Sequence, residues 1–430
     1  MPIGNGDLAA NVWVADQDLH ILISKSDAWS EESRLLKLGK VVLSCNPNLF
    51  SDSSFRQRLR MKDATVLLSG EHGALIKIWV DALTNLLKVE VVSPRRAIHI
   101  RLHLVVWRDR LRNFLPGEET SFMGATCRTR LSYPDTVIPA DNDGNIVWYH
   151  RNEDRSIFSE ELLHEGLDSS FVAGLSDPLL NRTFGALLRA ASSHDGDLTW
   201  FVSSGIQRLS SRVAATQHLI EVVAHTDVTS SVEDWRSGLS MRAEEVTASA
   251  AWSKDAHAAW WAAFWQRSYI NLGGSSAAAV VSRGYCLERY LQACGGRGEQ
   301  PLKFNGNLFT VEGRGFDADF RQWGGMYWLQ NTRLPYWGML SSGDLDLMGP
   351  LLRTYADALP VHEARALAWW GHAGAAVPEI MHWWGGLGDE VRRDGGVAAG
   401  RAMVAGGWQA CGCGVGGRRG WGWTGCEGEA

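Results

Sequence analysis

Residues 97–107 read Ala-Ile-His-Ile-Arg-Leu-His-Leu-Val-Val-Trp, and this stretch decides the fold of the N-terminal half. Apolar side chains at positions 98, 100, 102 and 104 alternate with His99, Arg101 and His103. This period of two residues predicts a strand with one buried face. Similar runs recur along residues 1–231: His20–Ser24, Leu75–Val80, Leu86–Val92, Leu198–Ser203 and His218–Ala224. Many strands without long helices between them predict an antiparallel sandwich.

The composition changes to Ala, Glu and Trp over residues 232–271, where we predict a helical linker. One face of this helix carries an aromatic stripe at helical spacing: His257, Trp261, Phe264, Trp265 and Ser268. The stripe could pack between two domains or bind a ligand. Packing is the favoured interpretation, because aromatic stripes at this spacing are more often core than binding site.

Residues 272–388 are predicted to be mostly helical, with glycine-rich connections between the helices. The candidate helices are Ala277–Cys294, Met326–Ser342 and Leu345–Ala358. Eleven of the 21 tryptophans lie between Trp252 and Trp384, so the aromatic excess belongs to this part of the chain. Such an excess is typical of large packed cores or of flat surfaces for ring-shaped ligands.

Residues 389–430 differ from the rest of the chain. Positions 391–430 hold thirteen Gly, with no Pro and no amphipathic period. Such a segment can bury little apolar surface, so we predict a disordered tail or the product of a coding sequence translated in the wrong frame.

The charge and the cysteines exclude several classes of partner. A net charge of −6 gives no general attraction to nucleic acid or to an anionic membrane. No run of eighteen apolar residues and no signal peptide are present, so no membrane partner is predicted and the localisation stays open. The seven cysteines form no Cys-x-x-Cys pair, and neither a metal nor a cofactor is predicted.

Three segments form recognisable motifs: Pro2-Ile3-Gly4-Asn5-Gly6-Asp7-Leu8, Lys303-Phe304-Asn305-Gly306-Asn307-Leu308-Phe309, and the run from Trp328 to Trp337. They resemble glycoside hydrolase family 95, the α-L-fucosidase group. Further motifs are Ser26-Asp27-Ala28-Trp29-Ser30-Glu31, Leu36-Lys37-Leu38-Gly39, Phe264-Trp265-Gln266-Arg267-Ser268, Arg321-Gln322-Trp323-Gly324-Gly325 and Gln330-Asn331-Thr332-Arg333. These are similar to a second family, domain of unknown function 5703, and the likeness covers about residues 1–388.

The resemblance implies an α+β multidomain, six-hairpin glycosidase-like fold. It would comprise an N-terminal antiparallel β-supersandwich at 1–231, a helical linker at 232–271, and the first part of an (α/α)6 toroid at 272–388. Six hairpins need twelve helices, at roughly 25–30 residues for each helix with its loop. The 117 residues from Leu272 to Gly388 hold about a third of that, so a truncated toroid is expected.

The resemblance also implies two catalytic candidates. Asn331 aligns with the second Asn of a pair that helps orient the attacking water in the fucosidase-like group, whereas Leu329 replaces the first. Asn331 could instead cap a helix or be a buried, satisfied amide. Glu379 follows Pro378 at the predicted first turn of a helix, where a carboxylate suits the helix dipole. The corresponding loop faces the sugar in related toroids.

The substrate-binding candidates are aromatic or polar side chains of the helical half. Arg333 could clamp a sugar or form an ion pair with Asp319 or Asp344. His372 could contact substrate or stabilise its loop. Asn5 is expected to adopt a left-handed turn conformation. The substrate-binding set is Asn305, Trp323, Trp328, Arg333, Trp337, Trp370 and His372, with Trp384 as a further stacking candidate.

The function implied by the resemblance is a carbohydrate-active protein. It would be a glycoside hydrolase acting on poly- or oligosaccharide by an inverting acid/base mechanism. Two alternatives stay open at this point: a non-catalytic carbohydrate-binding relative, and an inactive truncated gene product.

Overall fold

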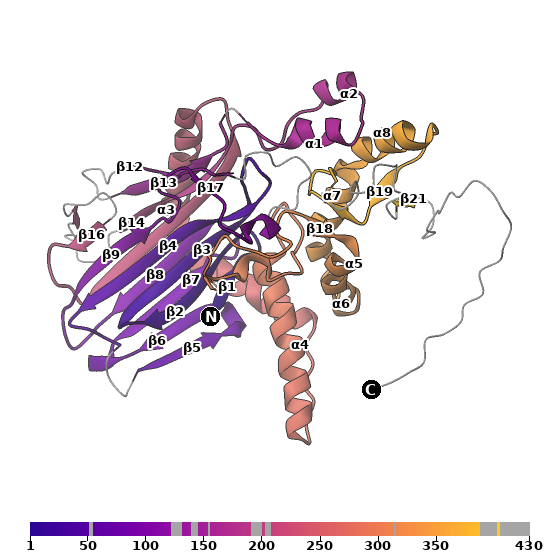
Figure 1. Ribbon diagram of the computed structural model, residues 1–430. Helices are drawn as coiled ribbons and strands as arrows, with labels where there is room; N and C mark the ends of the chain where they lie inside the picture. The colour runs from indigo at the N-terminus through magenta and orange to yellow at the C-terminus, as the bar shows by residue number, and fades with distance from the viewer. Residues whose placement is uncertain are drawn as a thin grey trace.

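The computed structural model describes residues 1–50, 55–121, 131–138, 145–153, 155–190, 200–202, 208–313, 315–387 and 402–404. Large antiparallel sheets and helices make up a mixed α and β architecture (Figure 1). The described helices include none with the length and apolar character needed to cross a bilayer.

Two large sheets form the N-terminal half. The first has seven strands in the order β1 (Pro2–Gly4), β2 (Leu8–Ala15), β3 (Asp18–Trp29), β4 (Leu35–Asn46), β9 (His99–Val105), β16 (Arg208–Ser211) and β15 (Trp200–Val202). The second has eight, in the order β12 (Thr136–Ile138), β13 (Ile146–Arg151), β14 (Arg182–Ala190), β17 (Gln217–Val228), β8 (Leu86–Val92), β7 (Leu75–Val80), β6 (Thr65–Ser69) and β5 (Arg56–Arg60). Neighbouring strands run antiparallel throughout both sheets.

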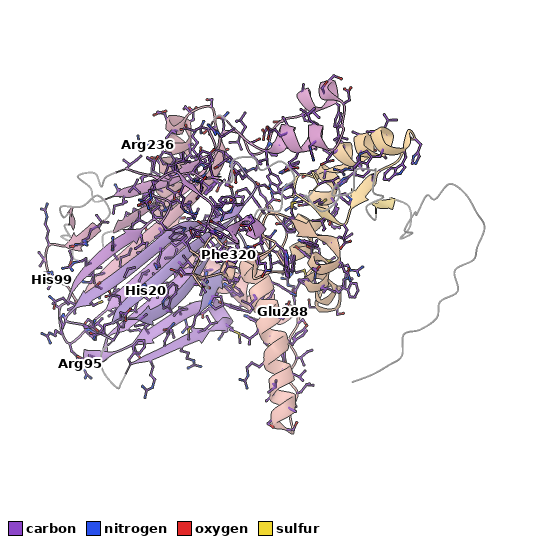
Figure 2. All side chains as sticks on the ribbon, viewed as in Figure 1. His20, Arg95, His99, Arg236, Glu288 and Phe320 are labelled. Atoms are coloured by element: carbon purple, nitrogen blue, oxygen red, sulfur yellow. The ribbon has the colours of Figure 1, made fainter. Side chains whose placement is uncertain are left out.

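The alternation along residues 97–107 produces the expected strand. In β9, Ile100, Leu102 and Leu104 are buried, whereas His99 and Arg101 are exposed. Their inward faces join buried side chains of both sheets in one hydrophobic core, because each strand of a half-buried sheet turns every second side chain inward. Arg95 and His99 lie at the end of the sheets farthest from α4–α8 (Figure 2).

The helices lie mainly in the C-terminal half. They are α1 (Phe158–His164), α2 (Ser169–Ala173), α3 (Val232–Arg267), α4 (Ser276–Gly295), α5 (Leu329–Thr332), α6 (Leu334–Ser342), α7 (Gly349–Asp357) and α8 (Leu359–Trp370). Short turns of 3-10 helix occur at Met61–Asp63, Glu71–Gly73, Glu118–Ser121, Asn307–Phe309 and Leu345–Met348. The remaining short strands are β10 (Arg112–Asn113), β11 (Leu131–Ser132), β18 (Tyr327–Trp328), β19 (Ala376–Pro378), β20 (Ile380–Met381) and β21 (Ala402–Val404).

The aromatic stripe of α3 is core, as favoured from the sequence. Trp261 and Phe264 are fully buried in a cluster with Tyr290 of α4 and Tyr336 of α6. His257 holds the turn after β7, since its Nδ1 accepts from the backbone N–H of Ala82 at 3.1 Å. The stripe therefore joins the long helix to both halves of the chain.

Three helix predictions differ from the structure. The helix predicted over Leu345–Ala358 is a 3-10 turn at Leu345–Met348 followed by α7 at Gly349–Asp357. The helix predicted over Met326–Ser342 is divided into β18, α5 and α6: Tyr327 and Trp328 pair with β20 instead, and Pro335 lies in the first turn of a separate helix, where its missing N–H is tolerated. Glu379 is not in the first turn of a helix: it lies between β19 and β20. Of the tail predicted at 389–430, β21 pairs with β19, and the other residues lie outside the described part of the chain.

Buried ion pairs tie the helical half to the sheets. Arg108 Nη1 donates to Asp319 Oδ2 at 2.6 Å, and its Nη2 lies 2.7 Å from Asp135 Oδ2. The backbone N–H of Lys37 in β4 also donates to Asp319, at 2.7 Å. Paired and hydrogen-bonded charges are the form in which ionised groups are tolerated in a core. The loop at 317–321 is therefore fixed against β4.

His150 of β13 predicts a pH-dependent stability. Its ring nitrogens lie 2.9 Å from Asp135 Oδ1 and 3.0 Å from Glu31 Oε2. Burial by itself lowers the pKa of His150, but the two carboxylates outweigh burial and raise the pKa to about 9 from 6.5. Because the folded pKa is the higher one, the stabilisation is complete below pH 6.5 and is lost as the pH rises through 9.

We expect deprotonation of His150 to lower the free energy of unfolding by about 3 kcal/mol between pH 6.5 and pH 9. Urea denaturation at pH 6, 7.5 and 9 should show this fall in the wild type and a flatter dependence in His150→Gln. Parallel pH dependences in the two proteins would contradict it.

Candidate functional site

Asn331 and Glu379 come together at the start of α5. Strand β18 pairs with β20, with Trp328 opposite Ile380. The side-chain Oε1 of Glu379 accepts a hydrogen bond from the backbone N–H of Gln330 at 2.8 Å. The backbone carbonyl of Glu379 accepts one from the backbone N–H of Leu329, also at 2.8 Å. The carboxylate thus binds the first turn of the short helix that carries Asn331, whose side chain is exposed.

Three other predicted residues lie together: Asn305 and Trp323 in the segment before β18, and Trp328 in β18 itself. Asn305 Nδ2 donates to the carbonyls of Gln322 and Trp323, at 2.7 and 3.1 Å. The rings of Trp323 and Trp328 meet edge to face at 6.5 Å. Asn305 therefore fixes the backbone that presents Trp323, which is 45% exposed.

The remaining predicted residues form two separate pairs. The guanidinium of Arg333 lies over the ring of Trp337 at 5.3 Å, and Trp370 of α8 stacks with His372 at 6.4 Å. The two carboxylates considered as partners of Arg333 bind other arginines: Asp319 binds Arg108, and Asp344 binds Arg289.

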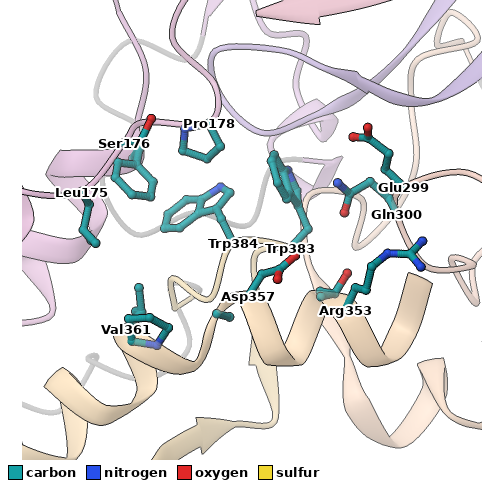
Figure 3. A pocket seen from close by; sticks show the side chains of 14 residues that line it. Leu175, Ser176, Pro178, Glu299, Gln300, Arg353, Asp357, Val361, Trp383 and Trp384 are labelled. Carbon is teal, nitrogen blue, oxygen red and sulfur yellow. The ribbon is translucent and has the colours of Figure 1, made fainter. Parts of the chain in front are cut away.

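Two cavities in the described part of the chain are lined by none of the nine residues above; of the other residues given a role from the sequence, Trp384 lines one cavity and Asn5 the other. The first, cavity 1, has a volume of about 490 Å³ and lies where α1–α2, α7–α8 and the segment after β20 meet (Figure 3). Its lining is Phe158, Leu175, Ser176, Pro178, Glu299, Gln300, Arg353, Thr354, Asp357, Ala358, Pro360, Val361, Trp383 and Trp384. A volume of this size suits a small ligand.

The adjacent Trp383 and Trp384 provide the largest side chains in the lining of cavity 1. Figure 3 shows both indoles in the middle of the lining, with Leu175 and Pro178 on one side and Gln300 on the other. Each has a buried indole Nε1–H without a hydrogen-bond partner in the protein, and the Oε1 of the buried Gln300 also has none. Two donors and one acceptor among the lining residues therefore have unused hydrogen-bonding capacity.

Rigid packing holds these indoles. Trp384 stacks on His382 at 4.7 Å with an angle of 7° between the rings, and meets Phe158 edge to face at 4.9 Å. Burial, helped by the nearby Lys303, lowers the pKa of His382 to about 3, so its ring is neutral at ordinary pH. The guanidinium of Arg182 lies over Trp383 at 5.3 Å.

Charged side chains stand at the exposed part of cavity 1. Asp357 and Arg353 come from the last turns of α7, and Glu299 comes from the loop after α4. All three side chains are exposed. Carboxylates beside aromatic surfaces can accept hydrogen bonds from hydroxyls or take part in proton transfer.

Neither cavity suggests a metal site. Within the described ranges, no three His, Cys, Asp or Glu side chains are grouped to hold a metal ion.

A family model described as Domain of unknown function (DUF5703) matches residues 1–270. The chain belongs to the DUF5703 family. This confirms the resemblance over residues 1–270, which hold both sheets and α3, whereas the motifs at 321–325 and 330–333 lie beyond the match. Cavity 1 therefore lies between residues of the DUF5703 match, such as Phe158 and Pro178, and residues that follow it.

Two solved structures are similar to this DUF5703 member. One is described as a kojibiose phosphorylase from human microbiome, with 13% identity and a TM-score of 0.48; it aligns over 90% of this chain and 50% of its own. The other is a bacterial glucoamylase complexed with acarbose, with 9% identity and a TM-score of 0.44, over 90% of this chain and 53% of its own. The chain thus spans about half the length of each, and at TM-scores below 0.5 neither match assigns an activity to it. A search of the curated proteins gave no match.

Sequence reasoning missed most of cavity 1. Of its lining, only Trp384 stood among the stacking candidates, on the basis of its residue type. Asp357 and Glu299 belong to no motif, and the contribution of Phe158 depends on the position of α1 against the helical half. The pair Trp383-Trp384 was the one local signal available.

Proposed function

We propose that the chain is a carbohydrate-active protein and that cavity 1 binds a sugar unit. The observation that carries the proposal is the combination of two indoles with unpartnered N–H groups and an amide oxygen with no partner. A pyranose presents apolar C–H faces that suit an aromatic surface, and its hydroxyls both donate and accept hydrogen bonds. The motif resemblance to glycoside hydrolase family 95 supports the same class.

The finer architecture belongs to this proposal. The two sheets would form a β-supersandwich and α4–α8 the first part of an (α/α)6 toroid, truncated here. Exposed apolar side chains support this, because Leu340, Leu352 and Leu367 on α6, α7 and α8 are 61, 63 and 63% exposed. Further hairpins of a toroid would cover such surface.

The catalytic form of the proposal is an inverting glycoside hydrolase. Such enzymes use two carboxyl groups, one as acid and one as base for the attacking water. Asp357 and Glu299 are the acidic side chains that line cavity 1. Asn331 and Glu379 stay proposed as catalytic residues at α5, and Asn305, Trp323, Trp328, Arg333, Trp337, Trp370 and His372 stay proposed as substrate contacts.

The binding test uses calorimetric titration with maltotriose, xylotriose and 2′-fucosyllactose. Trp383→Phe keeps an aromatic ring and removes the Nε1–H, so we expect affinity for the sugar that binds to fall about three- to tenfold. Gln300→Leu should act in the same direction.

The matched control is Trp13→Phe, because Trp13 lies on β2, stacks with His20, does not line cavity 1 and is not a proposed substrate contact. Unchanged affinity in this control is expected. If Trp337→Phe weakens binding and Trp383→Phe does not, the sugar site lies at the α5–α6 surface. Absence of binding to all three sugars would contradict the proposal.

A further inference from the structure

A second cavity shares one lining residue, Glu299, with cavity 1. Cavity 2 has a volume of about 600 Å³ and is lined by the turns after β1 and β7, by β3 and β17, by α3, and by the loop after α4. The side chain of Glu299 lines both cavities. The two spaces are therefore neighbours along one surface.

A fixed ionic network forms part of the cavity 2 lining. Lys25 Nζ donates to both carboxylate oxygens of Asp27 at 2.8 Å and lies 2.9 Å from Asp7 Oδ2. Asn85 Nδ2 also donates to Asp7 Oδ2, at 2.8 Å. The ammonium of Lys25 thus pairs with the carboxylates of both Asp7 and Asp27. This part of the lining therefore carries one net negative charge and has carboxylate lone pairs that are free to accept further hydrogen bonds.

Asn5 holds this lining in place, which corrects the sequence expectation for it. The left-handed conformation belongs to Gly6, with a φ of 97°, and not to Asn5. Asn5 Oδ1 accepts from the backbone N–H groups of Asp7 and Leu8, and its Nδ2 donates to the carbonyl of Thr84 at 2.8 Å. The amide therefore joins the first turn of the chain to the turn after β7.

Two other groups in the lining have unused hydrogen-bonding capacity. Thr226 Oγ1 and Arg297 Nη1 are buried and have no hydrogen-bond partner in the protein, whereas His225 Nε2 lies 3.9 Å from Asp227 Oδ2. Arg297 donates from Nη2 to the carbonyl of Ala82 at 2.9 Å, and its guanidinium lies 3.7 Å from the centre of the Trp260 ring. Burial lowers the pKa of Arg297 to about 10.

These groups favour a neutral, hydroxyl-bearing ligand over an ion. An anion would meet the carboxylates of Asp7, Asp27 and Glu299, whereas a cation would meet Lys25 and Arg297. A hydroxyl can donate to a carboxylate and accept from a guanidinium at the same time. The lining contains no Trp, Tyr or Phe, so hydrogen bonds rather than ring stacking would hold the ligand.

We propose that cavity 2 is a second saccharide subsite and that the ligand is an oligosaccharide that passes Glu299 from cavity 1 into cavity 2. This inference rests on the proposed function. Cavity 1 holds a sugar ring against its indoles, and cavity 2 holds a following unit through its hydroxyls. The ligand class is thereby narrowed from sugars in general to chains of at least two units.

The experiment measures affinity against chain length. The ligands are mono- to tetrasaccharides of the maltose and β-1,4-xylose series, titrated into the full chain. We expect affinity to rise with length and Thr226→Val to remove that gain, weakening the tetrasaccharide about three- to tenfold. The monosaccharide should bind Thr226→Val as it binds the wild type. Thr226→Val is nearly isosteric and removes a hydroxyl that has no partner, so the variant should fold.

Thr136→Val is the matched control, since Thr136 is exposed on β12 and lines neither cavity. Arg297→Met is the second variant, expected to act on the longer ligands only. Affinity that does not depend on length, or that Thr226→Val and Arg297→Met leave unchanged, overturns the second subsite. If Trp383→Phe still weakens binding in that case, the proposed function survives. Failure of every saccharide to bind overturns both.

Discussion

Glu165→Ala is expected to lower the free energy of unfolding by about 3–5 kcal/mol. Glu165 is buried after α1, and its Oε2 accepts from Arg365 Nε and Nη2 at 2.9 and 2.7 Å. Its Oε1 accepts from the backbone N–H of Leu387 at 2.6 Å. Removing the carboxylate leaves the fully buried guanidinium of Arg365 without its counter-charge, which costs more than the pair itself contributes.

The control for this loss is Glu245→Ala. Glu245 pairs with Arg242 at 3.0 Å on the surface of α3, where the side chains are 62 and 60% exposed. Exposed pairs contribute little, so we expect a change within about 0.5 kcal/mol. Urea denaturation followed by circular dichroism measures both. A loss below about 1 kcal/mol in Glu165→Ala would show that Arg365 finds sufficient partners in the carbonyls of Ala376 and Gly385.

Asp357→Asn is expected to lower kcat/KM for hydrolysis of the bound oligosaccharide about 10²–10⁴-fold, while Kd changes little. An amide keeps the shape and one hydrogen-bond acceptor of the side chain but cannot transfer the proton. Glu299→Gln should have an effect of the same order, because both carboxylates line cavity 1 and inversion needs two.

The comparison variants are Asn331→Ala and Glu379→Gln. Loss of turnover in these two, with Asp357→Asn and Glu299→Gln active, would place catalysis at the α5 surface. Melting temperatures must accompany the rates, because Glu379 also binds the first turn of α5. Saccharide binding without turnover in the wild type would identify a non-catalytic binding protein.

The sheets were predictable because one rule governs them locally. A half-buried strand must alternate its side chains, and β7, β8 and β9 follow the runs seen at 75–80, 86–92 and 97–107. The helix α3 was predictable for a similar reason, since its aromatic residues recur with a helical period. Both features can be predicted because they depend on the periodicity of residues that are close together in the sequence.

Cavity 1 could not be predicted in this way. Its lining comes from segments around residues 158, 299, 357 and 384, which are brought together by packing alone. The prediction of a helix starting at Pro378-Glu379 was also wrong. This residue pair is common at a helix start, but the pairing of β18 with β20 makes the segment extended. Long-range pairing overrode local propensity there.

The environment of Trp383 and Trp384 makes them an intrinsic optical reporter. Trp384 lies flat against a neutral His382, and Trp383 lies 6.2 Å from Trp29, so all three rings share one neighbourhood. A saccharide bound against their rings changes the polarity around the excited indoles. A change in tryptophan emission on titration that is reduced in Trp383→Phe would therefore follow occupancy of cavity 1 without a label.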